Sequence, residues 1–379
     1  MNHSKSIITM YYKRLIILYW LSALLIFISC SNEKRSPKNI VNYDLEDIRD
    51  EKYLLSNIAD SIIYYPISCT DDNTTNYLKR VDIQLTNDYI FITHLRIGQL
   101  YNRHTGELIR EIDLGSPFEQ PSFWWGNFVS KNYITPSGKE YYIRERIEQK
   151  GKPHFRLLTK SLSNDSLLNS IKLPSFYSFP LNEDLIWEWK HTDVSDSTIT
   201  MNWYNNKGSL LKETQLNDIA LSKKYLIHIL KDSIFYHSDG SSKIYLLTKD
   251  SVLQLFNIRN GKIRDLHIGV DKLFFTNVSL KEETPFFINH HNIYKLSSIN
   301  SGLINDIDGG LDFWPKNISH SGEMYSWYSI EELKTKVNQS SSHLMKNPEA
   351  VKRLKEMLNQ LPKETNIILA VLKEKKQHE

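Results

Sequence analysis

The sequence predicts an all-β protein, folded as a six-bladed β-propeller with short helices inserted near the C-terminus before the closing strand. From about residue 60 to residue 330, short runs rich in aliphatic and aromatic residues are interrupted by Asn, Asp, Ser or Gly, a pattern typical of strands and turns. No long amphipathic helix separates these runs, which disfavours a parallel sheet built from βαβ units. In addition, one strand–turn–strand unit recurs along this region.

The recurring unit is a strand, a polar turn, and a second strand that opens with apolar residues. It is clear at residues 100–109, 203–211 and 255–263, and weaker at 158–167 and 294–303. A glycine in each clear copy is expected to supply the positive φ of a hairpin. The turn positions, Gly106, Asp165, Gly208, Gly261 and Gly302, lie 41 to 59 residues apart. A period near 40 to 50 residues is typical of a propeller blade.

A closing blade is needed to complete the ring, because only five hairpins are visible. The apolar segment 367–372 is expected to pair beside the strand at residues 62–67 and to supply this blade. The uneven spacing of the turns leaves an irregular β-sandwich, or two of them, as the alternative architecture.

Two helices are expected before the closing strand, at about residues 330–338 and 348–361. Ser329 and Glu332 have the spacing of a capping box. Asn347 followed by Pro348 predicts a second helix N-terminus. Apolar residues recur behind it at helical spacing, at Val351, Leu354, Leu358 and Leu361. We expect this helix to pack on the surface of the propeller.

The N-terminus has the layout of an export signal. Lys13 and Arg14 precede an apolar run of fourteen residues, 15–28, which is too short for a permanent membrane span and ends at Ser29 and Cys30. We expect residues 1–29 to be a lipoprotein signal peptide and Cys30 to carry acyl chains such as palmitate. Residues 30–52 are then a flexible tether and 53–379 the propeller. The alternative is an ordinary signal sequence with an incidental cysteine.

The charge distribution excludes a nucleic-acid partner. Of the 47 basic side chains, Lys5, Lys13 and Arg14 precede Cys30, where no acidic residue occurs, so the 44 that remain equal the 44 acidic side chains. A neutral domain lacks the basic surface that phosphates require. The second cysteine, Cys69, leaves no internal disulfide and is expected to be buried and inert.

Tryptophans are the candidate ligand-binding residues, because their faces stack on sugar rings or peptide side chains. The candidates are Trp124, Trp125, Trp187, Trp189 and Trp314. Trp187 and Trp189 lie two residues apart, so in a strand they share one face. Packing between blades is the favoured interpretation for most of these rings, with Trp124 or Trp125 at an open face.

No metal, cofactor or catalytic residue is predicted. Asp306, Asp308 and Asp312 fail the ligand spacing of a calcium loop, so we expect a tight Asp-Gly turn whose carboxylates cap backbone amides. His290 and His291 are neighbours, so on a strand they would point to opposite faces. The sequence also lacks the common hydrolase and nucleotide-binding motifs.

Four stretches together resemble the six-bladed β-propeller lipoproteins that are abundant in Bacteroidetes. They are the end of the signal segment at Cys30, the opening strand at 55–67, the hairpin at 101–109 and the segment Asn-Asp-Ile-Asp-Gly-Gly-Leu-Asp-Phe-Trp-Pro at 305–315. The resemblance spans most of residues 50–375 and implies the propeller fold. That family has no generally assigned reaction, so the resemblance implies no catalytic residues.

We therefore expect a non-catalytic lipoprotein of the cell envelope, anchored through its N-terminal lipid, with the outer membrane as the expected location. Its propeller would present a binding surface to a glycan, a peptide or an envelope protein. The alternative is a hydrolase or lyase whose residues converge on the propeller axis without forming a local motif. A third hypothesis is a structural subunit that contacts its assembly through the C-terminal helix.

Overall fold

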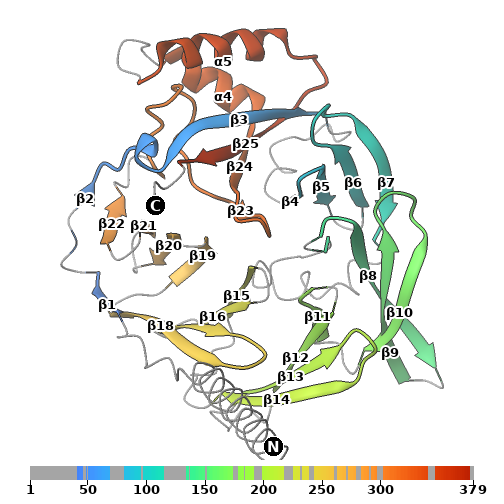
Figure 1. The fold of residues 1–379 in the computed structure, drawn as a ribbon. Coiled ribbons are helices and arrows are strands. Elements are labelled where there is room, and N and C mark those ends of the chain that lie inside the picture. Colours follow the sequence, from blue (N-terminus) through green and yellow to red (C-terminus); the bar gives the residue numbers. More distant parts are fainter. Residues whose placement is uncertain are drawn as a thin grey trace, which may run out of the picture. The chain divides into compact units, whose positions relative to one another are not determined.

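Six β-sheets surround a central axis in the computed structural model, which confirms the predicted six-bladed propeller (Figure 1). The structure describes residues 41–375, apart from 46–47, 49, 69–80, 95–96, 115–133, 136, 150–151, 174–177, 183, 192–198, 217–224, 231–232, 239–242, 260–262, 270–271, 279–282, 290–291, 297–301 and 340–345. The signal segment and Cys30 therefore lie outside the described residues.

The first three blades follow the chain from the axis outwards. Blade 1 contains β4 (Asp82–Leu85), β5 (Tyr89–His94), β6 (Ile97–Asn102) and β7 (Leu108–Asp113). Blade 2 contains β8 (Glu140–Gln149), β9 (Lys152–Ser161) and β10 (Leu167–Leu173), with Ile134 bridged to Tyr141 beside β8. Blade 3 contains β11 (Ser178–Pro180), β12 (Leu185–His191), β13 (Ile199–Asn205) and β14 (Leu210–Leu216).

The remaining blades include strands from the start of the chain. Blade 4 contains β15 (Tyr225–Leu230), β16 (Ser233–Ser238), β17 (Lys243–Leu247), β18 (Val252–Arg259) and β1 (Val41–Asp44). Blade 5 contains β19 (Ile263–Ile268), β20 (Lys272–Val278), β21 (Glu283–Asn289), β22 (Asn292–Leu296) and β2 (Asp50–Glu51). Blade 6 contains β23 (Asn317–Ile318), β24 (Met324–Ser329), β25 (Ile367–Glu374) and β3 (Ala59–Ile67).

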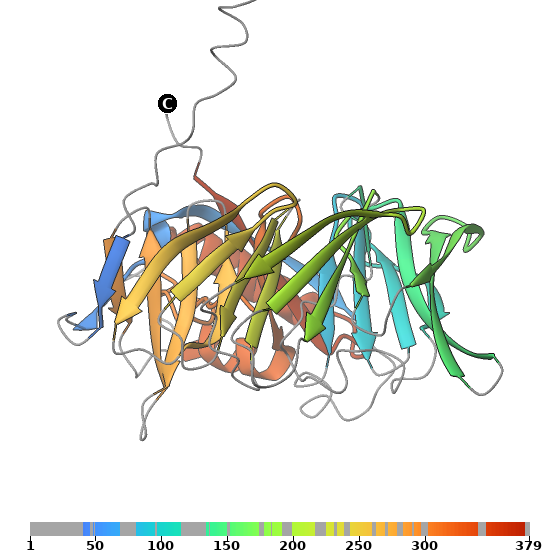
Figure 2. The same ribbon diagram turned by 90° about the horizontal axis from the view of Figure 1, so that it is seen from below.

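The antiparallel order of the strands gives the propeller two different faces. In blades 1 to 5, counting the Ile134 bridge as the first strand of blade 2, the turns after the first and third strands lie on one face, which we call the turn face. The connection after the second strand and the connection to the next blade lie on the other, which we call the loop face. Figure 2 shows the blades from the side, with the green and yellow hairpins of blades 3 and 4 along one edge.

Three of the five predicted hairpin turns are confirmed. Gly106 and Gly208 have φ of 74° and 79°, and Asp165 adopts the same left-handed conformation at 63°. Gly261 does not belong to a hairpin, since β18 and β19 lie in different blades; the residue itself is outside the described part. Gly302 is not a turn either. A Cβ there would lie 2.5 Å from the Phe313 carbonyl oxygen, so close backbone approach requires this glycine.

The predicted ring closure is confirmed in pairing and register. β25 pairs antiparallel with β3, Ile367 lying opposite Ile67 and Leu372 opposite Ile62. The outermost strand of blade 6 thus comes from the start of the domain and its three inner strands from the end.

The ordered domain begins earlier than the sequence predicts. Residues 41–51 were expected to be part of a tether, but β1 pairs in parallel with the outer edge of β18, and β2 with that of β22. Both strands are short and polar and follow no turn, so the pattern that marks the other strands is missing. Val41–Glu379 forms one compact unit.

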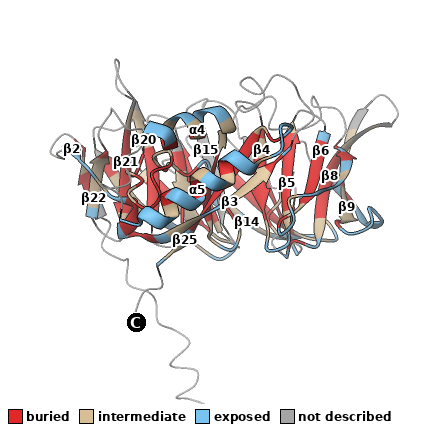
Figure 3. Ribbon diagram, turned by 90° about the horizontal axis from the view of Figure 1, so that it is seen from above, coloured by how far each residue is buried: buried red, intermediate tan, exposed pale blue. Residues whose placement is uncertain are grey.

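The two predicted helices are confirmed between β24 and β25, as α4 (Ile330–Gln339) and α5 (Pro348–Gln360). The Ser329 hydroxyl accepts the Glu332 amide at 3.1 Å, and the Asn347 side chain accepts the Ala350 amide at 3.1 Å. Figure 1 shows both helices outside β3 and β25, and Figure 3 shows the exposed outer side of α5. Neither described helix is long and apolar enough to cross a membrane.

The largest fully buried side chains are aromatic, and Figure 3 shows the buried stretches of the strands in red. Trp187 and Trp203 lie opposite each other on β12 and β13, and both are fully buried. Phe275 stacks on Phe286 in blade 5, with ring centres 5.3 Å apart. The buried rings support the predicted packing role for tryptophan in blade 3.

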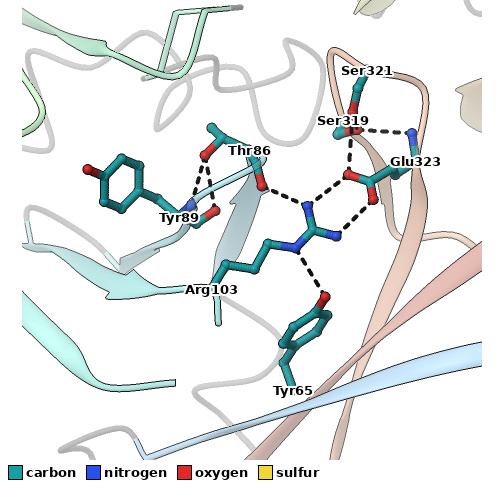
Figure 4. Close-up of polar contacts among 7 residues, drawn as sticks. All are labelled: Tyr65, Thr86, Tyr89, Arg103, Ser319, Ser321 and Glu323. Atoms are coloured by element: carbon teal, nitrogen blue, oxygen red, sulfur yellow. Dashed lines mark hydrogen bonds and ion pairs between the residues drawn. The ribbon is translucent and has the colours of Figure 1, made fainter. Parts of the chain in front are cut away.

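An ion pair links blade 6 to blade 1 at the ring closure (Figure 4). Arg103 follows β6, and its guanidinium donates to both Glu323 carboxylate oxygens, at 2.8 and 3.0 Å. It also donates to the Thr86 carbonyl at 2.8 Å and to the Tyr65 hydroxyl at 3.2 Å. Ser319 accepts the Glu323 amide at 2.9 Å. The Arg103 side chain is only 8% exposed, so the Glu323 carboxylate is needed to compensate its buried positive charge.

We expect Glu323→Gln to lower the free energy of unfolding by about 2 kcal/mol, because the Arg103 guanidinium would stay buried without its counter-charge. Urea denaturation measures this loss. Glu331→Gln, at an exposed position of α4, is the matched control and should change stability by less than about 0.5 kcal/mol. Equal effects of the two substitutions would contradict the assigned role of the ion pair.

Candidate functional site

The best-defined candidate site lies where the innermost strand of blade 6 begins, at its loop-face end. β23 has two residues and pairs only with Tyr325 and Met324 at the start of β24. Beyond these pairs no described strand pairs with the inner edge of β24, and Lys316, the residue before β23, reaches across it. Its amide donates to the Tyr325 carbonyl at 3.0 Å, and its ammonium donates to the Trp327 carbonyl at 2.5 Å.

Two aromatic rings adjoin this ammonium. The Lys316 nitrogen lies 5.0 Å from the centre of the Trp327 ring and 5.7 Å from that of Tyr328. Both distances are within the range of cation–π attraction. Trp314, two residues before Lys316, is partly buried and meets Phe274 of blade 5 edge-on, with ring centres 5.5 Å apart. We call Trp314, Lys316, Trp327 and Tyr328 the blade 6 cluster.

The surroundings of Lys316 change its protonation. Burial of the ammonium lowers the pKa of Lys316 to about 8, although the negative charge of Glu332 on α4 raises it in part. The residue as a whole is exposed, so the protein atoms that crowd the amine do not close it off from solvent. Among the described residues the Trp327 carbonyl is its one hydrogen-bond acceptor. An ammonium has three N–H groups, so two can serve a ligand.

The Asp-Gly segment, which leads to Trp314 in the chain, is held by its own carboxylates. The Asp306 carboxylate accepts the Ser56 amide at 2.9 Å, Asp308 the Gly310 amide at 3.1 Å, and Asp312 the Asn305 amide at 3.2 Å. These bonds are the carboxylate caps that the sequence predicts. Among the described residues, no group of three His, Cys, Asp or Glu side chains is placed to hold a metal ion.

Asp308 is the buried centre of this segment. Its Oδ1 also accepts the Asn305 side-chain amide at 2.8 Å and the Tyr64 hydroxyl at 3.2 Å. Burial raises the pKa of Asp308, although these hydrogen bonds act in the opposite direction. The Tyr328 hydroxyl donates to the Asp312 carbonyl at 3.4 Å, which joins the segment to the blade 6 cluster. The role of Asp308 is therefore structural: its hydrogen bonds hold the Asp-Gly segment in place.

A second buried polar group lies in blade 3. The Tyr204 hydroxyl donates to Glu188 at 2.6 Å, and the Asn202 amide donates to the same oxygen at 3.0 Å. Burial, followed by the neighbouring Glu188 carboxylate, raises the pKa of Tyr204 to about 12. Glu188 and Asn202 are each 3% exposed, so this group lies within the core rather than at a surface.

The five tryptophans predicted as ligand-binding residues differ in their burial. Trp187 is fully enclosed, so its ring is a core element. Trp189 lies on the same strand, but its side chain is outside the described part, as are Trp124 and Trp125. Trp314 alone among the five is described with partial exposure, and it belongs to the blade 6 cluster.

Sequence reasoning did not identify Lys316. No motif surrounds it, and its altered pKa arises from burial beside β24, which depends on the three-dimensional fold. The only sequence signal was its place directly after the Trp314-Pro315 pair that ends the Asp-Gly segment.

Comparison with known proteins identifies the fold class. No protein-family model and no curated protein matches the sequence. Among solved structures, the chain is similar to a Bacteroides fragilis protein described as exported, with 12% identity and a TM-score of 0.55, over 89% of this chain and 100% of that one. This likeness shows a shared propeller fold.

Two archaeal proteins show partial likeness. The acylaminoacyl peptidase of Pyrococcus horikoshii is 11% identical with a TM-score of 0.38, over 68% of this chain and 44% of that one. The β-propeller domain of the Trilobed protease of Pyrococcus furiosus is 11% identical with a TM-score of 0.38, over 65% of this chain and 77% of that one. At these scores neither likeness extends to the whole fold.

We expect Lys316 to react with trace acetic anhydride along a pH profile with its midpoint near 8, since its pKa is about 8. At pH 7.5 the free-amine fraction of Lys316 is roughly two hundredfold larger than that of an ordinary lysine of pKa near 10.4. Peptide mass spectrometry reads the rate, with exposed Lys352 on α5 as the reference. Glu332→Gln should move the midpoint lower, because it removes the charge that favours the ammonium. A Lys316 rate still rising steeply above pH 9 would contradict this.

Proposed function

We propose that this protein is an exported cell-envelope lipoprotein whose loop face binds a glycan through the blade 6 cluster without transforming it. The supporting observation is the amine of Lys316, which lies beside Trp327 and Tyr328, with Trp314 two residues away, and keeps two N–H groups for a ligand. A sugar offers both an apolar ring face and oxygen acceptors. A carboxylate-bearing sugar would gain most from the ammonium.

The lipid anchor is the second part of the proposal. A basic segment, an apolar run too short to span the bilayer and a cysteine at its end coincide at residues 13–30. Two or three acyl chains on Cys30 would hold the chain stably at a membrane, with the outer membrane as the proposed site. The likeness to a protein described as exported supports this location.

A glycan and peptide array with the processed protein tests the binding role. We expect micromolar binding to an acidic glycan, weakened at least tenfold by Trp314→Ala and by Lys316→Met, because each removes one of the two recognition elements. Lys352→Met, an exposed lysine on α5, is the matched control and should bind as the native protein does. Binding of peptides alone, or of nothing, would reject the glycan assignment. Trp124→Ala and Trp125→Ala extend the test to the segment that joins β7 to Ile134.

Metabolic labelling with an alkyne analogue of palmitate tests the anchor. We expect the analogue to label the native protein and to be lost in Cys30→Ser, since the thiol is the acylation site. Cys69→Ser, which changes the other cysteine, should leave the labelling unchanged. An unlabelled native protein, or a label that survives Cys30→Ser, would refute lipidation at Cys30.

An enzyme is the second candidate function, and the amine of Lys316 favours it. A lysine with a pKa of about 8 can act as a general base or as a nucleophile toward a carbonyl group, as a hydrolase or lyase at the propeller axis would require. Mass spectrometry of the recovered array ligand separates the two functions. Intact ligand supports binding, whereas conversion that Lys316→Met abolishes supports catalysis.

A further inference from the structure

Exposed apolar side chains recur at one position in four successive blades. The last strand in chain order of each of blades 1 to 4 begins with two large apolar residues that expose 36% to 58% of their surface. They are Leu108 and Ile109 in β7, Leu167 and Leu168 in β10, Leu210 and Leu211 in β14, and Val252 and Leu253 in β18. Each pair directly follows a turn of the turn face. We call these eight residues the apolar arc.

The contacts between neighbouring blades show that the arc is regular. In blade 1, Arg110 donates to the Leu162 carbonyl in the turn of blade 2, at 2.5 Å. In blade 2, Asn169 donates to the Asn206 carbonyl in the turn of blade 3, at 3.5 Å. In blade 3, Lys212 donates to the Asp250 carbonyl in the turn of blade 4, at 3.3 Å. In blades 1 to 3 each of these strands therefore touches the turn of the next blade, and the apolar pairs occupy equivalent places at the starts of their strands.

Three of the four outer edges in the arc also lack a neighbouring strand among the described strands. β18 carries β1 and β22 carries β2, whereas among the described strands nothing pairs with the outer edges of β7, β10 and β14. Open strand edges beside exposed leucines promote self-association unless something covers them. Blades 5 and 6 differ, because their outer strands begin with the polar Asn292 and with Ala59 and Asp60. The exposed apolar pairs at this position are thus confined to blades 1 to 4, although Ile63 on β3 is singly exposed in blade 6.

The position where β1 begins, together with the length of chain that separates it from Cys30, indicates what covers this sector. β1 runs parallel to β18, with Val41 opposite Phe256, so the first residue of β1 lies toward the end of β18 where Val252 and Leu253 lie. Val41 and Leu253 are three strand positions apart, about 10 Å. Between Cys30 and Val41 there are ten residues, which span at most about 36 Å when extended. A lipid on Cys30 would therefore keep this end of blade 4 close to the bilayer.

From this geometry we infer that the apolar arc rests on the lipid surface of the membrane that holds the anchor. The turn face of blades 1 to 4 then faces the bilayer, and the loop face with Lys316 faces away from it. The leucines enter the interface between headgroups and acyl chains, and the lipid covers the region beside the open edges. This inference rests on the proposed lipid anchor. The anchor alone does not determine which face of the propeller lies toward the membrane, and the apolar arc assigns that face.

Collisional quenching by brominated lipid tests the orientation. Single cysteines replace Leu168, Leu211 or Ile97 in the full processed chain carrying Cys69→Ser, and each is labelled with an environment-sensitive fluorophore. Ile97 is the matched control, because it is 45% exposed but begins β6 at the loop-face end of blade 1. Each protein is inserted through its anchor into phosphatidylethanolamine and phosphatidylglycerol vesicles, with or without bromine on the acyl chains. Unfolding midpoints confirm that the variants fold.

We expect bromine to lower the fluorescence at least twofold for Leu168→Cys and Leu211→Cys and to leave Ile97→Cys unchanged. Vesicle flotation is measured first, so that a failed anchor is distinguished from a wrong orientation. Protein that floats without quenching at 168 and 211, or with equal quenching at 97, overturns the inference. Self-quenching that rises with the protein-to-lipid ratio, without bromine quenching, would instead assign the arc to a second copy and also overturn it.

Discussion

The fold depends on the pairing of two strands that lie about 300 residues apart, β3 and β25. Every other blade is built mainly from consecutive strands, but blade 6 exists only when the two ends of the domain meet. Ion pairs hold this blade on both sides. Arg103 in blade 1 binds Glu323, and Lys272 in blade 5 binds Glu374 at 2.6 Å. Closing so long a loop costs entropy, which the paired apolar strand and these charges offset.

The same closure builds the candidate site. Tyr64 on β3 donates to Asp308, Ser56 donates to Asp306, and the segment they hold leads through Trp314 to Lys316. The start of the domain therefore fixes the loop that positions the amine. Because the inner strand of blade 6 is only two residues long, the edge of β24 stays open for Lys316 to occupy. A longer β23 would replace the lysine by ordinary strand pairing.

Local patterns in the sequence were sufficient for much of the fold. Alternating apolar runs, turn glycines and the cap at Asn347 are signals carried by neighbouring residues, and the segment at 367–372 was apolar enough to be recognised as a closing strand. The signals failed where a contact joins distant positions. Arg103 and Glu323 are 220 residues apart, and the sequence around either residue gives no indication that the two pair. β1 and β2 are too short and polar to show periodicity, and parallel addition to a sheet edge leaves no turn to read.

The way β1 and β2 join the propeller also determines how the domain responds to tension. A force applied at the N-terminus loads β1 first, where four residue pairs join it to β18. It then loads β2, which has two pairs, and only afterwards β3, with its eight pairs to β25. The weaker ladders can peel from the outside of blades 4 and 5 while the ring stays shut. Their detachment lengthens the N-terminal connection under load, and they can pair again when the force falls. The β3–β25 pairing that closes the ring is thereby protected from the first part of the load.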